Sequence, residues 1–312
     1  MEQNKTGKVV VTGSFIVDIA VFTPRFPADG ETVSGKNIKF GPGGKGSNQA
    51  TAANRAGAEV IMITKVGTDF MSDIARTHYQ NENMTQKYVY TQDNGETGSA
   101  IIEINMETAE NRIIVLKGAN AAITEEEINR AEEEFKTCDV MLTQLESSEA
   151  SVVESIRLAR KYGKIVVLNP APASKINEAI LKDVDYITPN ETEAEFFTGI
   201  RVTDEKTAEQ AANCLLAKGV KNVIITLGKA GVYAKTKEYQ GIVPSFRVKA
   251  VDTTGAGDAF NGGFCAALAE GKNVKDAILF ANALAAISVT RQGTSPAMPY
   301  REEIEKMLKG EC

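Results

Sequence analysis

The stretch CDVMLTQLESSEASVVESIRLARKYGKIVVLN, residues 138–169, carries the alternation that decides the fold. Two short, mainly apolar segments, 138–145 and 164–169, flank residues 148–163, where apolar side chains recur at helical spacing. Apolar strands that are joined by an amphipathic helix are typical of parallel neighbours in a sheet covered on both faces. The stretch therefore predicts a strand–helix–strand unit.

The same alternation continues in both directions along the chain. Ser47 is the predicted N-cap of a helix over 47–56, which Gly57 ends. The remaining segments are predicted as strands over 8–13, 60–66, 185–190 and 222–228, and as helices over 69–83, 174–183 and 204–218. This order predicts an α/β fold with a doubly wound, mostly parallel sheet, whose ligands bind beyond the carboxyl ends of the strands.

Two regions do not follow the alternation of strands and helices: residues 15–40 and 97–117. Both read as strands without helices to cover them, and the second contains a hairpin whose turn is expected near residues 107–110. We predict a small sheet that projects from the edge of the large one, as a lid over the site or as a dimer surface. Residues 1–312 are thus expected to form a single domain with this lid.

Composition excludes several classes of function. Of the 312 residues, 43% are hydrophobic and 24% are charged, as in soluble globular proteins. The net charge of −6 and the lack of a Lys/Arg block argue against a nucleic-acid partner. No apolar run approaches the roughly 18 residues of a membrane span, and the N-terminal run is too short for a signal peptide. We expect a cytoplasmic protein with no membrane or nucleic-acid partner.

The cysteines and the histidine do not indicate a metal, redox or catalytic site. The chain has four widely spaced cysteines, Cys138, Cys214, Cys265 and Cys312, and no C-x-x-C pair. This spacing argues against zinc and redox-pair sites and is consistent with a reducing compartment. His78 is the only histidine. It lies in a polar helical stretch, so we predict a surface residue rather than a catalytic one.

Small residues and an aspartate precede a helix at Gly255-Ala256-Gly257-Asp258. Because the first N–H groups of a helix lack partners within it, small residues there let an anion such as phosphate approach. An aspartate at that place repels an anion unless it takes part in the chemistry. The alternative is an ordinary aspartate that caps the helix.

Three further stretches could contact a ligand, and each has a purely structural alternative. FGPGGKGSNQA, residues 40–50, is neither a Walker A loop nor a dinucleotide fingerprint, so a nicotinamide enzyme is disfavoured. It could present Lys45 and Asn48 to a polyhydroxylated ligand, or be a simple turn. Residues 189–193, PNETE, could orient hydrated Mg²⁺ and phosphate, or cap a helix. Residues 226–231, TLGKAG, could be a plain turn.

Together and in this order, the motifs resemble the ribokinase-type carbohydrate kinases, from about residue 8 to 308. The stretches that carry the resemblance are G-S-x-x-x-D at 13–18, GGKGSNQA at 43–50, QLE at 144–146, LNPAPA at 168–173, PNETEAE at 189–195, ITLGKAG at 225–231 and VDTTGAGDAFNGGF at 251–264. The resemblance implies a ribokinase-like fold and an ATP-dependent pentose kinase that works with Mg²⁺ and K⁺.

The resemblance also assigns roles to residues. Gly255, Ala256 and Gly257 would form the anion hole for the transferring phosphoryl group, and Asp258 would be the catalytic base, for which a lowered pKa suffices. The sugar would contact Ile16, Asp18, Gly44, Lys45, Asn48, Glu146 and Asp258. The ATP side would be lined by Asn190, Glu193, Thr226, Gly228, Lys229, Gly231, Gly257 and Asn282, with Glu193 acting on Mg²⁺ through water. K⁺ would be held by Asp252, Thr254, Ser288, Arg291, Gly293 and Ala297.

Two departures from the family pattern affect these expectations. Ala297 replaces a serine that would be a K⁺ ligand, which weakens the potassium prediction. Ile16 replaces an asparagine two residues before Asp18, and an isoleucine cannot hydrogen-bond a sugar hydroxyl. The expected reaction is phosphorylation of the 5-hydroxyl of D-ribose to ribose 5-phosphate, with 2-deoxyribose as the alternative sugar. A non-catalytic sugar-binding regulator is the other alternative, and a homodimer through the lid sheet is expected.

Overall fold

Alternate residues of the first strand enter two different cores. In the computed structural model, which describes residues 6–108 and 110–311, Val9 and Val11 belong to one apolar cluster and Val10 belongs to the other. Successive side chains of a strand point to opposite faces, so both faces of the sheet are covered. The doubly wound arrangement predicted from the sequence is confirmed.

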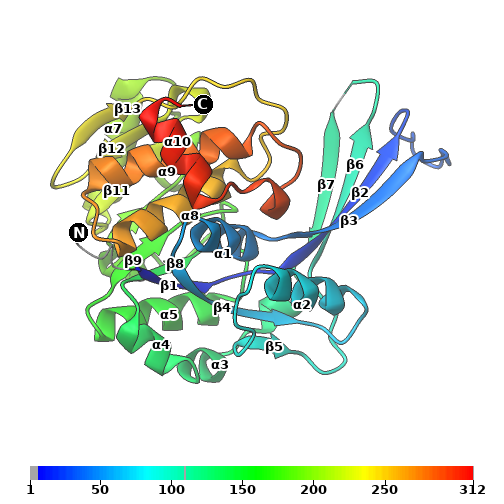
Figure 1. The fold of residues 1–312 in the computed structure, drawn as a ribbon, viewed down its shortest axis with the longest axis horizontal. Helices are drawn as coiled ribbons and strands as arrows, with labels where there is room; N and C mark the ends of the chain where they lie inside the picture. Colours follow the sequence, from blue (N-terminus) through cyan, green and yellow to red (C-terminus); the bar gives the residue numbers. More distant parts are fainter. Residues whose placement is uncertain (1–5, 109, 312) are drawn as a thin grey trace.

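The large sheet has nine strands and is mostly parallel (Figure 1). In spatial order they are β13 (Gln240–Val243), β12 (Val232–Lys235), β11 (Asn222–Thr226), β10 (Tyr186–Ile187), β9 (Ile165–Leu168), β8 (Val140–Thr143), β1 (Lys8–Thr12), β4 (Glu59–Val66) and β5 (Val89–Thr91). Only the pairs β11–β12 and β12–β13 are antiparallel. The sequence did not predict β5, β12 or β13, which have only three or four residues each.

Helices cover both faces of this sheet (Figure 1). The cluster that contains Val9 includes buried residues of α1 (Lys45–Arg55), α2 (Met71–Asn81), α8 (Ala256–Ala269), α9 (Val274–Ser288) and α10 (Arg301–Lys309). The cluster that contains Val10 includes residues of α3 (Glu125–Asn129), α4 (Glu132–Thr137), α5 (Glu149–Lys161), α6 (Glu191–Thr198) and α7 (Glu205–Ala217). Every helix within the described ranges is too short or too polar to cross a bilayer.

Two predicted helices differ from the structure. The helix expected over 47–56 starts at Lys45, because Gly44, at φ 86°, serves as its N-cap without a side-chain cap. Ser47 is therefore a buried residue of the first turns and not the N-cap. The helix expected over 174–183 is a 3₁₀ segment, Glu178–Asp183. Three other 3₁₀ segments cover Gly118–Ala122, Gly228–Ala230 and Ser295–Ala297.

The small sheet stands apart from the large one (Figure 1). Its order is β3 (Asn37–Gly43), β2 (Ile16–Thr23), β6 (Ser99–Asn105) and β7 (Asn111–Leu116), with β2 and β6 parallel and the outer pairs antiparallel. A small sheet formed by these two regions of the chain was predicted and is confirmed. The predicted turn at 107–110 falls between β6 and β7, although residue 109, like Cys312, lies outside the described residues.

Candidate functional site

The site is a cavity where several strands of the large sheet end. It is lined by residues at or after the ends of β9, β10 and β11, at the starts of α1 and α6, and in the loop before α8 and its first two turns: Lys45, Asn169, Ala171, Thr188, Asn190, Glu193, Thr226, Thr253, Gly255, Ala256, Gly257, Asp258 and Asn261. The prediction that a ligand site lies beyond the carboxyl ends of parallel strands agrees with this position.

Helix α8 begins at Gly255, whose φ of 78° is favourable for glycine. Ala256, Gly257 and Asp258 follow as the first turn and face the cavity. The N–H of Ala256 donates to the carbonyl oxygen of Thr253 at 3.2 Å, so this group already has an internal partner. Small residues at a helix N-terminus leave room for an anion beside the remaining N–H groups.

Asp258 is not a helix cap. The N-cap is Gly255, and the buried carboxylate of Asp258 points to α1 instead. Its Oδ2 accepts a hydrogen bond from Asn48 Nδ2 at 2.9 Å, and its Oδ1 accepts one from Gln49 Nε2 at 2.9 Å. The structural alternative offered for this residue is therefore wrong, because both oxygens are held by side chains from another helix.

Burial raises the pKa of Asp258 above its usual range, although Lys45, Asn48 and Gln49 oppose this shift. A lowered pKa was expected for a catalytic base, and this expectation is wrong. Loss of hydration disfavours the charged form of a buried carboxyl group, and here that effect is larger than the stabilisation by one ammonium and two amides.

Glu146 connects β8 to the start of α1. Its Oε2 accepts hydrogen bonds from Ser14 Oγ at 2.5 Å and from the backbone N–H of Lys45 at 2.9 Å. Burial disfavours the Lys45 ammonium, but the carboxylates of Asp258, Glu146 and Glu193 more than offset this and raise the pKa of Lys45. Lys45 therefore brings a full positive charge to a cavity edged by acids.

Asp18 lies at the base of the small sheet, where its Oδ2 accepts a hydrogen bond from Thr294 Oγ1 at 3.3 Å. Burial raises the pKa of Asp18 from 3.8 to about 6, and the nearby carboxylates of Glu146 and Asp258 add to this rise. The three acids therefore share one electrostatic environment, although they come from β2, the end of β8 and α8.

Ile16 occupies the same face of β2 as Asp18, because residues two apart in a strand point to the same side. Its side chain is only 2% exposed. Within the described part of the chain, it is the only buried apolar residue larger than alanine that belongs to neither apolar cluster. Ile16 is therefore buried without being part of the main packing.

Asn190 and Glu193 cap helix α6 reciprocally. Asn190 Oδ1 accepts from the N–H of Glu193 at 2.8 Å, and Glu193 Oε2 accepts from the N–H of Asn190 at 2.9 Å. The capping alternative is thus confirmed, yet both residues also line the cavity. Burial raises the pKa of Glu193, while the Asn190 N–H and Lys45 oppose the rise.

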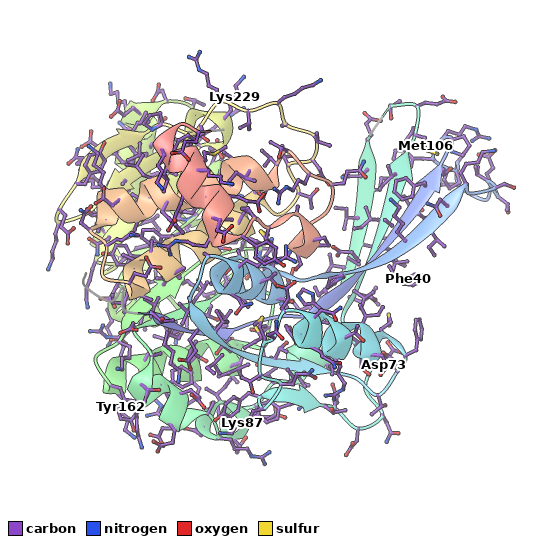
Figure 2. All side chains as sticks on the ribbon, viewed as in Figure 1. Phe40, Asp73, Lys87, Met106, Tyr162 and Lys229 are labelled. Atoms are coloured by element: carbon purple, nitrogen blue, oxygen red, sulfur yellow. The ribbon has the colours of Figure 1, made fainter. Side chains whose placement is uncertain are left out.

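The predicted ATP-side residues are only partly brought together. Thr226, at the end of β11, lines the cavity, but Gly228, Lys229, Gly231 and Asn282 are not among its lining residues. Lys229 is exposed on the turn after β11 (Figure 2). The Asn282 amide instead donates to the carbonyl oxygens of residues 243 and 244, at 3.3 and 3.2 Å.

The residues predicted for a monovalent cation come from two adjacent loops. Asp252 joins them, because its Oδ1 accepts from the N–H of Thr254 at 2.9 Å and its Oδ2 from the N–H of Gly293 at 3.0 Å. Burial opposes ionisation of Asp252, but these N–H groups lower its pKa. Ser288 Oγ donates to the carbonyl oxygen of residue 285. Arg291 is paired with a glutamate of α10, and Ala297 is buried.

His78 is buried, which contradicts the predicted surface position. Its Nε2 lies 2.9 Å from Thr51 Oγ1 on α1, and burial lowers its pKa to about 4. Sequence reasoning also passed over polar residues of the site, because their partners are distant in the chain: Gln49, Asn169, Thr188, Asn261 and Thr294. Gln49, Asn169 and Asn261 lie within the quoted motifs at 43–50, 168–173 and 251–264, whereas Thr188 and Thr294 had no specific signal.

Comparisons with known proteins agree with this geometry. A family model described as pfkB family carbohydrate kinase matches residues 6–301. A ribokinase of Haemophilus influenzae is 40% identical over 301 residues, which are 96% of this chain and 98% of that protein. A deoxyribokinase of Salmonella typhi is 38% identical, with the same coverage of both chains.

A structure of Arabidopsis thaliana ribokinase complexed with ribose and ATP has a TM-score of 0.91 to this chain. It is 29% identical, and the match covers 98% of this chain and 99% of that one. The ribokinase-like fold implied by the motifs is confirmed.

The raised pKa of Asp18 predicts a pH-dependent change in stability. Between 3.8 and about 6 the folded chain holds a proton that the unfolded chain releases, so the contribution of Asp18 to the free energy of unfolding falls as pH rises through this range. Asp18→Asn should therefore raise the free energy of unfolding at pH 8 by up to about 3 kcal/mol, and the gain should shrink towards pH 4.

Urea unfolding of the ligand-free protein at several pH values measures this effect. Asp29→Asn, which changes an exposed carboxylate of the small sheet's loop, is the matched control and should change stability little at any pH. Equal stability of the Asp18→Asn variant and the parent at pH 8 would contradict the electrostatic argument.

Proposed function

Because this chain belongs to the pfkB family of carbohydrate kinases, we propose that it is a cytoplasmic kinase that transfers the γ-phosphate of ATP to the 5-hydroxyl of D-ribose. The observation that carries the proposal is the buried Asp258 carboxylate, which faces a cavity at the N-terminus of α8 and lies near the Lys45 ammonium. The ribokinases at 37–40% identity support ribose as the sugar.

Asp258 would orient the attacking hydroxyl and accept its proton. In a loose phosphoryl-transfer transition state, positioning and charge stabilisation matter more than strong basicity. A raised pKa suits this role, because a carboxylate whose negative charge is poorly stabilised accepts a proton more readily at neutral pH. Lys45 and the N–H groups of the first turn of α8 would then stabilise negative charge on the transferring group.

Mg²⁺ is part of the proposal, and the cavity offers one carboxylate, that of Glu193, to orient it. Within the described residues there is no group of three acidic, histidine or cysteine side chains that could hold a metal. Mg²⁺ in such enzymes is held mainly by phosphate oxygens and water, with one or two carboxylates. Glu193, which has only Oε2 committed to the Asn190 N–H, would orient the ion through water. When bound, Mg²⁺ neutralises charge on the phosphates.

K⁺ is the other proposed cofactor. Asp252 ties together the two loops that would surround it, with Thr254, Ser288, Arg291 and Gly293 as the other residues of the proposed set. Ala297 supplies no side-chain oxygen. When bound, K⁺ would add positive charge beside the first turn of α8. Exchange of potassium for sodium in the assay below would show whether activity depends on it.

Replacement of Asp258 tests the base role. Asp258→Asn should lower kcat by about 10²- to 10⁴-fold, because the proton acceptor is removed while the size of the side chain is kept. A coupled ADP-release assay with ribose measures kcat, and titration calorimetry checks that ATP still binds. Turnover close to that of the parent would remove Asp258 from this role, whereas a non-catalytic sugar-binding regulator would release no ADP even in the parent.

A second candidate function is phosphorylation of 2-deoxyribose. Ile16 favours it, since this apolar side chain is buried beside Asp18 and outside the main apolar packing. A sugar hydroxyl against Ile16 would lose a hydrogen bond, which costs about 1–3 kcal/mol when the hydroxyl is buried. A deoxyribokinase of Salmonella typhi is 38% identical to the chain, close to the ribokinases.

Replacement of Ile16 distinguishes the two sugars. If Ile16 faces the 2-position, Ile16→Asn should raise kcat/KM for ribose relative to 2-deoxyribose by about 2- to 12-fold, the value of one hydrogen bond to a hydroxyl. The ADP-release assay with both sugars, run on the parent and the variant, gives this ratio. If both activities fall together and the ratio stays constant, Ile16 only packs the strand, and the argument for 2-deoxyribose is lost.

We also propose a homodimer formed through the small sheet. The side chains of β7 are exposed along the whole strand, including Ile113, Ile114, Val115 and Leu116. Phe40 on β3 and Met106 at the tip extend from the same sheet (Figure 2). An uncovered apolar sheet of this kind is unfavourable in water unless a partner covers it, and a second copy would bring an identical apolar surface.

The exposed strand makes the dimer testable. Ile114 is 63% exposed, so Ile114→Lys should not affect folding but should place two charges in the interface. Light scattering at micromolar concentration should give a dimer for the parent and a monomer for the variant. A parent that is strictly monomeric would contradict the proposal. Lys309→Ala, on the exposed end of α10, is a control that should remain dimeric.

A further inference from the structure

The Gln49 side chain is fully buried on α1 and does not face the ligand cavity. Its Nε2 donates to Asp258 Oδ1 at 2.9 Å and to Asn169 Oδ1 at 3.0 Å. Both acceptors line the cavity, whereas Gln49 is not among its described lining residues. An amide in this position can influence Asp258 without contacting a substrate.

Neighbouring groups fix the direction of the Gln49 amide. The Thr188 carbonyl oxygen can only accept a hydrogen bond, and Asn169 Nδ2 donates to it at 2.9 Å. Asn169 therefore turns its oxygen towards Gln49, which must present its NH₂ group. On the other side, Gln144 Nε2 donates to Gln49 Oε1 at 2.7 Å, so the oxygen of Gln49 faces away from Asp258.

The linked side-chain amides of Asn169, Gln49 and Gln144 end in an acceptor without a hydrogen-bond partner. Gln144 Oε1 is buried and has no hydrogen-bond partner among the described residues. A buried acceptor without a partner is destabilising. If Gln144 turned its amide over, two oxygens would face each other at Gln49. The arrangement therefore tolerates one unpaired oxygen at Gln144 and keeps the donors directed towards Asp258.

We infer that Gln49 is a positioning residue for the reaction, held in its donating orientation by Gln144 and Asn169, and that it fixes the carboxylate of Asp258 and favours its ionised form. The inference rests on the proposed function for the role of Asp258 as the base. Asn48 holds the other oxygen of Asp258, and its own Oδ1 accepts from Ser295 Oγ at 2.7 Å. Asn48 is in the predicted sugar site, whereas Gln49 was not predicted to contact a substrate.

Removal of the Gln49 donor should act on the proton acceptor and not on substrate binding. Burial and the Glu146 carboxylate raise the pKa of Asp258, whereas Lys45, Asn48 and Gln49 oppose this rise. The carboxylates of Asp18 and Glu193 are the other charged groups that interact with Asp258. A hydrogen bond to a charged group corresponds to about one to two pH units. The competing explanation is that the amides only join α1, β8, β9 and α8, in which case their loss lowers stability without changing the titration of Asp258.

The experiment compares Gln49→Met and Gln144→Met with the parent enzyme. For Gln49→Met we expect kcat to fall by about 10- to 100-fold with KM for ribose and ATP nearly constant, and the acid limb of the kcat–pH profile to move upward by about one to two pH units. Gln144→Met, which does not contact Asp258, should shift the limb in the same direction by a smaller amount, because only one of the two groups that orient the Gln49 amide is lost and Asn169 remains.

Thr51→Val is the matched control. Thr51 is also a buried hydrogen-bonding residue of α1, but its hydroxyl contacts the Ser47 carbonyl oxygen and His78. This variant should lose thermal stability and keep the parental acid limb. The inference is overturned if both glutamine variants fold and leave the acid limb and kcat unchanged, or if they raise KM at constant kcat.

A direct titration separates this inference from the proposed function. In ligand-free protein with ¹³C-labelled aspartate, the Asp258 signal, assigned with Asp258→Asn, should titrate at higher pH in Gln49→Met than in the parent. If the parent releases no ADP with ribose or 2-deoxyribose, the proposed function fails, and this titration still decides whether Gln49 controls Asp258. An unchanged titration overturns the inference whatever the activity.

Discussion

The pair of hydrogen bonds from α1 to the carboxylate of Asp258 is the contact on which the site depends. Asn48 and Gln49 are 210 and 209 residues from Asp258 in the chain, and each donates to a different oxygen at 2.9 Å. Such contacts require α1 and α8 to pack closely. Gly262 on α8 permits this approach, since a Cβ there would lie 2.4 Å from the Gln49 carbonyl oxygen. The orientation of Asp258 is therefore a consequence of helix packing.

Charge balance is the second constraint on the cavity. Burial raises the pKa of Asp18, Asp258 and Glu193. The carboxylates of Asp258, Glu146 and Glu193 stabilise the Lys45 cation. A buried site with more acids than cations has a high cost of ionisation in the free protein. Hydroxyl groups that donate hydrogen bonds, and metal ions that accompany phosphates, both reduce this cost. The same excess of acidic groups disfavours the binding of a polyanion unless cations accompany it.

The sequence predicts the large sheet well because its strands are buried on both faces and therefore read as continuous apolar runs. It fails for β12 and β13, which are short and have exposed or half-buried ends. The candidate site was found where motifs follow strands or precede helices, as at Glu146, Asn190 and Asp258. The burial of His78 and the hydrogen bonds of Gln49 depend on residues from other elements. No local pattern encodes such partners, and the raised pKa of Asp258 likewise follows from burial that spacing does not show.

In the function and dimer proposed above, the small sheet would connect sugar recognition to association. Ile16 and Asp18 lie on one face of β2, and β2 pairs with both β3 and β6, so the strand that carries these two residues is held on both sides. Asp18 also accepts a hydrogen bond from Thr294, which lies in the loop before the 3₁₀ segment 295–297. This hydrogen bond anchors the base of the small sheet to the helical body. A partner that covers the apolar side chains of β7 would restrict the motion of the same four strands. Because a rigid sheet would hold Asp18 and Ile16 at one distance from Asp258, the proposed dimer would couple association to the proposed sugar selectivity through the pairing of β2 with its neighbours.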